Sequence, residues 1–184
     1  EWENLKVVTV PNFQNKLFVG IKYGVDGKHV AMSIATKVDE KIFVESIDCQ
    51  SVRNGNTWII SFLKEADIEK VVIDGSGSQQ ILSDEIKDYG IKLKPVLPKV
   101  SDVVVANNMF EQAVTSSKNI CHNDQPSLKQ IVTNCKRRAI GTNGGFGFKA
   151  MMEEHEIALL DSVILAHWAC ATYKGVKKKQ KISC

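Results

Sequence analysis

The segment 71–86 constrains the fold more than any other part of the sequence. Residues 71–73 are three consecutive β-branched apolar residues, which is typical of a buried strand, and the Gly-Ser-Gly run at 75–77 indicates a turn directly after it. The apolar stripe of a helix begins at Ile81. Asp74 is therefore expected at the carboxyl end of a central strand, where open α/β sheets bind their ligands. An Asp at a turn also hydrogen-bonds its own backbone in many proteins, so this segment alone leaves both roles open.

Length and composition indicate a single globular domain. The chain has 184 residues, of which 43% are hydrophobic, enough for one substantial core. Its apolar runs are all shorter than the about 20 residues that span a bilayer, and it carries no signal-peptide pattern, so we expect no membrane association and no secretion. The five cysteines are scattered without a CxxC pair, which favours core thiols over a zinc site or a disulfide framework.

The periodicity of the first half predicts strands before helices. Strand patterns cover 17–23, 29–36 and 41–47, and the turns between them are short, so these strands are expected to form an antiparallel meander. A helix pattern follows from Asn56, then the strand before Asp74, a helix to about residue 89 and a further strand over 91–96.

The second half predicts helices around one hairpin. Helices are expected from Ser101, from Pro126 and over about 154–173, with a hairpin over 139–149 that turns at Gly144-Gly145. The chain as a whole predicts an α/β fold, a mixed sheet of three antiparallel strands and then parallel strands, flanked by helices. We expect a lead-in from a preceding domain over 1–16, one domain over 17–173 and a basic tail over 174–184.

The last predicted helix contains a second informative carboxylate, Asp161. Leu160, Val163, Ile164 and Ala166 surround it, and a helix that is apolar on most of its circumference is buried. Ionised carboxylates are rarely buried unless they are paired or bind a cation. A structural partner such as an arginine explains Asp161 as one alternative, and a metal ion explains it as the other.

Two carboxylates at a strand end are typical of cation-dependent phosphodiesterases. Mg²⁺ and Mn²⁺ take carboxylate oxygens and substrate phosphates as ligands. In two-metal sites the ions activate a water molecule and stabilise the leaving oxygen. Such a site normally needs a third acidic residue, usually on the first strand.

Several motifs together resemble one family. They are residues 17–35, the strand end at 71–75, the run Cys121-His122-Asn123-Asp124-Gln125-Pro126-Ser127-Leu128, the basic cluster Lys136-Arg137-Arg138 at the expected end of the Pro126 helix with its hairpin, and residues 157–168. With them the chain resembles the C-terminal nuclease domain of the terminase large subunit of tailed bacteriophages, an RNase H-like (retroviral-integrase-like) domain that cuts concatemeric double-stranded DNA during genome packaging.

The resemblance implies a metal-dependent endonuclease. It implies two Mg²⁺ or Mn²⁺ ions, double-stranded DNA as substrate and the host cytoplasm as location. It also implies an ATPase domain in the same polypeptide, and the small terminase subunit and the portal protein as partners. This chain contains no GxxxxGK[ST] motif of its own.

The first strand departs from the family pattern at Lys22. The family carries an Asp after an apolar-Gly-apolar run such as Val19-Gly20-Ile21, and this chain has Lys22 there. A charged lysine cannot ligate a cation, and its ammonium competes for the cation's position. Asp26 lies just beyond and is an alternative ligand; otherwise Lys22 is an inactivating substitution.

The resemblance assigns the remaining acids to Asp74 and Asp161. The family's last acid aligns with Ala158, and Asp161 lies one turn later on the same side of the helix. Glu156 is the second choice for this ligand.

The predicted DNA-facing residues are Lys136, Arg137, Arg138 and Lys149. Lysine and arginine neutralise phosphates, and these residues lie in or beside the predicted hairpin. An ordinary solvated surface is the alternative interpretation of this cluster.

Two other functions remain open from the sequence. The first is a catalytically impaired RNase H-like domain that binds DNA or packaging partners, which Lys22 favours. The second is another RNase H-like nuclease such as a resolvase or transposase, which places its acids on similar strands.

Overall fold

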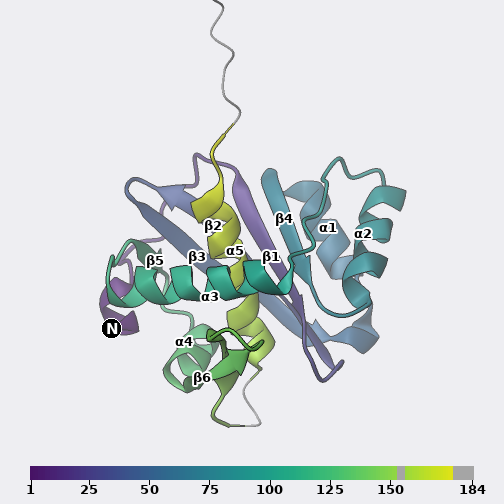
Figure 1. Ribbon diagram of the computed structural model, residues 1–184. Helices are drawn as coiled ribbons and strands as arrows, with labels where there is room; N and C mark the ends of the chain where they lie inside the picture. The colour runs from purple at the N-terminus through teal and green to yellow at the C-terminus, as the bar shows by residue number, and fades with distance from the viewer. Residues whose placement is uncertain (153–155, 176–184) are drawn as a thin grey trace, which may run out of the picture.

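The computed structural model describes residues 1–152 and 156–175, and this part of the chain forms a five-stranded mixed sheet (Figure 1). The strands are β1 (Leu17–Tyr23), β2 (His29–Val38), β3 (Lys41–Ser51), β4 (Ile68–Asp74) and β5 (Ile120–His122), in the order β4-β1-β2-β3-β5. The first three pair antiparallel, whereas β4 pairs parallel to β1 and β5 parallel to β3. The predicted meander followed by parallel strands is confirmed.

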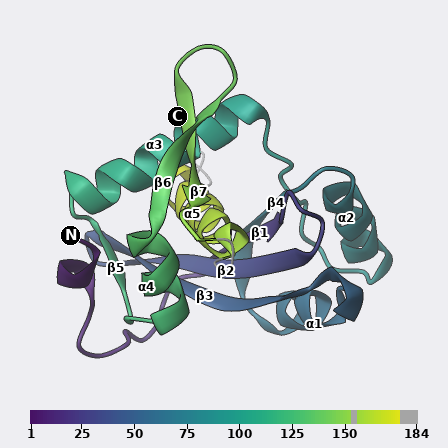
Figure 2. The same ribbon diagram turned by 90° about the horizontal axis from the view of Figure 1, so that it is seen from below.

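Helices cover both faces of the sheet. They are α1 (Thr57–Glu65), α2 (Ser78–Asp88), α3 (Val100–Thr115), α4 (Pro126–Thr133) and α5 (Ile157–Thr172). Figure 2 shows α3 and α5 on one side of the sheet and α1 on the other. The buried apolar residues divide in the same way, because one core joins the sheet to α3, α4 and α5 and the other joins it to α1 and α2. The helix that carries Asp161 therefore lies directly on the sheet.

The predicted strand over 91–96 is wrong. This segment is extended but contributes only one bridge to the sheet, between Val96 and Val72 of β4. Pro95 and Pro98 lack the N–H groups that a longer ladder needs. The fifth strand of the sheet is β5, which pairs at the opposite edge with β3.

The basic cluster lies in a hairpin rather than at a helix end. The Pro126 helix stops at Thr133, and Lys136, Arg137 and Arg138 belong to β6 (Cys135–Ile140). This strand pairs antiparallel with β7 (Gly145–Ala150), which confirms the predicted hairpin. The turn through Gly144, which has a φ of +76°, brings the chain back along β6. The hairpin packs against α3 and α5, so it borders the acid-bearing side of the sheet.

The first residues contribute to the core. Trp2 and Leu5 lie in a short 3₁₀ helix (Trp2–Leu5) and are only 3% and 5% exposed. The Trp2 ring stacks on the buried His122 ring at a centroid distance of 3.9 Å, and His122 Nε2 lies 2.8 Å from the Trp2 carbonyl oxygen. Residues 1–16, expected to be a lead-in, therefore supply part of the packing around β5.

Two predicted features fall partly outside the described residues. These are the first two residues of the predicted last helix, at 154–155, and the lysine-rich end at 176–184. Among the helices at 1–152 and 156–175, none has the length and apolar character that a membrane crossing requires.

Candidate active site

The position of Asp161 follows from a close contact between α5 and β1. A Cβ atom on Gly20 would lie 2.1 Å from the Ser162 carbonyl oxygen and 2.5 Å from the Ala166 amide nitrogen, so only glycine permits this approach. Ser33 of β2 strengthens the contact through a 2.6 Å hydrogen bond between its hydroxyl and that of Ser162. Asp161, the neighbour of Ser162, is thereby held over the sheet next to β1.

The position of Asp74 follows from the end of β4. Gly75 has a φ of +143°, and a Cβ atom there would lie 2.5 Å from the Cβ of Tyr23. The chain therefore turns sharply against β1 directly after Asp74. In the parallel register Asp74 is the partner of Lys22, the residue at the position where the sequence led us to expect an Asp.

Lys22, Asp74, Arg138 and Asp161 line one small cavity. Its volume is about 20 Å³, and the remaining lining residues come from α3, β7 and α5. Lys22 Nζ donates a hydrogen bond of 2.6 Å to Asp74 Oδ2, and these two side chains are only 14% and 20% exposed. The structure thus brings three of the predicted catalytic and metal residues together and adds Arg138, which was expected only at the DNA-facing edge.

The charges in this cavity compensate one another. Burial is the main reason that the pKa of Asp161 is raised to about 6; the positive charges of Lys22 and Arg138 lower this pKa, and the negative charge of Asp74 raises it. Two carboxylates therefore face two cationic side chains. Asp74 is paired with Lys22, as a buried carboxylate requires, whereas the charges of Lys22 and Arg138 offset only part of the desolvation of Asp161.

These residues do not fit a pair of metal ions in this arrangement. The Lys22 ammonium occupies Asp74 Oδ2, one of the two oxygens through which this carboxylate would bind a cation, and ammonium has no lone pair for a metal. The cavity that Asp74 shares with Asp161 has a volume of about 20 Å³ and room for about one water molecule, whereas the cavity of about 260 Å³ that Lys22 and Asp74 also line does not include Asp161. A two-metal centre would require Lys22 to be replaced or moved.

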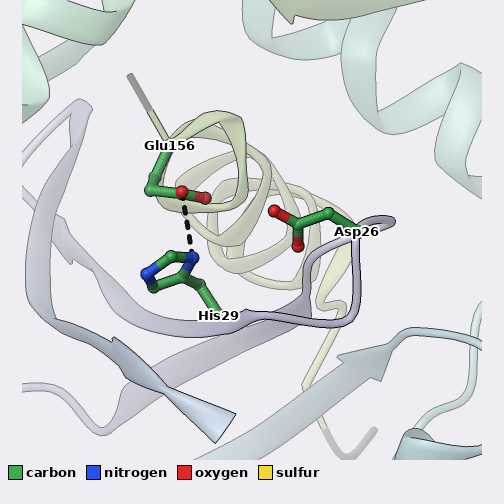
Figure 3. A group of neighbouring side chains, drawn as sticks. All are labelled: Asp26, His29 and Glu156. Carbon is green, nitrogen blue, oxygen red and sulfur yellow. Dashed lines mark ion pairs between the residues drawn. The ribbon is translucent and has the colours of Figure 1, made fainter. Parts of the chain in front are cut away.

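Asp26 and Glu156 belong to a different group of side chains, shown in Figure 3. Together with His29 they place one potential metal-ligating atom each within 4.8 Å of the others. Asp74 and Asp161 are not members of this group. The sequence reasoning considered Asp26 and Glu156 separately and missed His29; the Asp-x-x-His spacing across the turn before β2 is the signal that could have found it.

The predicted DNA-facing residues divide between the two faces of the hairpin. Lys136 and Lys149 are register partners, so their side chains share a face, and Arg138, two residues along β6, shares it too. Arg137 lies on the opposite face, where its Nε donates to Glu111 Oε2 at 2.9 Å and its guanidinium lies 4.2 Å from the centre of the Phe146 ring. Arg137 is therefore engaged within the protein.

Comparisons with known proteins identify the fold. No protein-family model and no curated protein sequence matches the chain. Among solved structures, the large terminase of bacteriophage HK97 superimposes with a TM-score of 0.67 at 14% identity, over 90% of this chain and 42% of that one. This chain therefore spans about two fifths of the HK97 terminase.

Two shorter structures cover the same region of the fold. The large terminase nuclease of the thermophilic phage G20c, solved with bound magnesium, gives a TM-score of 0.60 at 14% identity, over 88% of this chain and 83% of that one. The large terminase nuclease domain of a Thermus phage gives 0.55 at 12% identity, over 86% of this chain and 82% of that one. The chain has the RNase H-like fold of the nuclease domain of phage large terminases.

Proposed function

We propose that this chain is the nuclease-fold domain of a phage large terminase, that it binds double-stranded DNA during genome packaging, and that Lys22 impairs its cleavage of that DNA. The observation that carries the proposal is the ion pair between Lys22 and Asp74 inside a cavity that Asp161 also lines. The similarity in fold to the G20c large terminase nuclease supports the assignment of the domain. An ATPase domain in the same polypeptide, the small terminase subunit and the portal protein are partners that belong to the same proposal.

The hairpin supplies the expected contact with DNA. Lys136 and Lys149 are exposed on one face of β6 and β7, and Arg138 on that face also reaches the acid cavity. Cationic side chains along one face neutralise phosphates and release their counterions.

DNA binding in the presence of EDTA tests this proposal. We expect the Lys136→Ala/Lys149→Ala double variant to bind a double-stranded oligonucleotide more weakly, and its plot of log K against log salt to be shallower by about 2. The matched control is Lys92→Ala/Lys94→Ala, which removes the same charge from two exposed residues after α2. Equal losses of affinity in both double variants would contradict a specific role for the hairpin.

A two-metal endonuclease is the second candidate function. Asp74 and Asp161 favour it, because they line one cavity and two carboxylates in one cavity are typical of a cation-dependent nuclease. Two Mg²⁺ or Mn²⁺ ions are the cofactors expected for this function. Cleavage of supercoiled plasmid DNA by the unchanged chain would favour this candidate. Cleavage only after Lys22 is replaced by Asp would favour the impaired domain.

A further inference from the structure

We propose that Asp26, His29 and Glu156 bind a divalent transition-metal ion at a site separate from the Asp74–Asp161 cavity. The three side chains come from the turn between β1 and β2, the first residue of β2 and the residue before α5. Figure 3 shows them converging on a common space, and their potential ligand atoms all lie within 4.8 Å of one another. Ligands around one metal ion are spaced in this way, because each lies about 2.0–2.3 Å from the ion.

The backbone holds Asp26 and His29 in fixed relative positions. The Gly24 amide donates to the His29 carbonyl at 2.8 Å, which closes the turn between them. The Lys28 amide donates to Asp26 Oδ1 at 2.9 Å, so Oδ2 remains available to a metal ion. The turn therefore presents a carboxylate and an imidazole together without further rearrangement.

His29 directs one ring nitrogen at Glu156, at ion-pair distance. Its Nδ1 atom is shielded from solvent and makes no hydrogen bond of normal geometry, although it lies only 2.9 Å from Glu156 Oε1. Without a proton between them, the ring nitrogen and the carboxylate oxygen are both acceptors, and a metal ion bound to both would satisfy them together.

The ligand types select the class of ion. Two carboxylates and one imidazole suit Zn²⁺ or Mn²⁺, whereas Mg²⁺ takes almost exclusively oxygen ligands in a strict octahedron. His29 and Glu156 also line a cavity of about 270 Å³ with Ser127 and Gln130. Three protein ligands beside such a space leave coordination positions open to water or to another ligand.

Calorimetric titration of the whole chain with Zn²⁺, and separately with Mn²⁺, tests the proposal. We expect one ion per chain, and at least a tenfold weaker affinity in His29→Ala and in the Asp26→Asn/Glu156→Gln double variant. The matched control is Asp39→Asn/Glu40→Gln, which removes the same two kinds of carboxylate from exposed residues in the turn between β2 and β3 and should leave the affinity unchanged. Unchanged affinity in His29→Ala, or loss of binding only in the control, would overturn the proposal.

A measurement on the unchanged chain covers the case in which a variant fails to fold. In amide NMR spectra, substoichiometric Mn²⁺ should broaden the signals of the turn before β2 and of the first turn of α5 before those of other residues. Broadening that begins elsewhere, or none at millimolar Mn²⁺, would contradict the site. The outcome is independent of DNA binding and cleavage, so a failure here leaves the proposed function untouched.

Discussion

Replacing Asp161 by asparagine should make the protein's free energy of unfolding depend less on pH. Burial raises the pKa of Asp161 from its ordinary value of 3.8 to about 6. At about 1.4 kcal/mol for each pKa unit, the ionised carboxylate costs the folded state about 3 kcal/mol relative to the unfolded state. Asparagine is nearly the same size and carries no charge to desolvate.

The sign of the effect follows from proton binding. Between pH 3.8 and pH 6 the folded protein holds a proton on Asp161 that the unfolded chain has released, so the free energy of unfolding falls as the pH rises through this window. Well above pH 6 Asp161 is ionised in both states, and the free energy of unfolding is lowered by the full cost of burying its charge. Asp161→Asn should therefore match the unchanged protein near pH 4 and exceed its free energy of unfolding by up to about 3 kcal/mol near pH 8.

Urea denaturation at a series of pH values from 4 to 8 measures this difference. All other titrating groups are common to both proteins, so the gap between the two curves isolates Asp161. Two parallel curves, with a constant gap at every pH, would refute the burial of an ionisable Asp161 in this cavity.

Three further changes test the contacts that build the site. Gly20→Ala should lower the free energy of unfolding by about 1–3 kcal/mol or more, because the added Cβ atom would lie 2.1 Å from the Ser162 carbonyl oxygen. An unchanged denaturation midpoint would rule out the close approach of α5 and β1. Trp2→Ala should cost about 3–5 kcal/mol in the same assay, since Trp2 is 3% exposed, and a cost below about 1 kcal/mol would mean that the first residues do not join the core. Lys22→Met should move the pKa of Asp161 above about 6 in a carboxyl ¹³C titration, because the Lys22 charge lowers it; a pKa that stays or falls would contradict their proximity.

The features that local sequence patterns control were predictable. The meander, the strand that ends at Asp74 and the buried helix around Asp161 each follow from a periodicity within a few turns of chain. The predicted strand over 91–96 has such a periodicity too, but Pro95 and Pro98 limit its pairing to a single bridge. The short strand β5 forms because tertiary packing holds it against β3, which no local pattern indicates.

The composition of the two side-chain groups was harder to predict. Arg138 reaches the Asp161 cavity only because the hairpin folds back over α5. Glu156 meets His29 only because the start of α5 lies against the turn before β2, which is far earlier in the chain. Such contacts depend on how the layers pack, and a single sequence carries little information about that.

Cleavage of supercoiled plasmid DNA with Mn²⁺ tests the central claim most directly. The comparison needs the unchanged chain, Lys22→Asp, and Lys22→Asp combined with Asp74→Ala, each with its folding checked by circular dichroism. Because the Lys22 ammonium occupies one of the two oxygens through which Asp74 would bind a cation, we expect no nicking by the unchanged chain, nicking by Lys22→Asp, and its loss in the double variant. Nicking by the unchanged chain as fast as by Lys22→Asp would contradict the account.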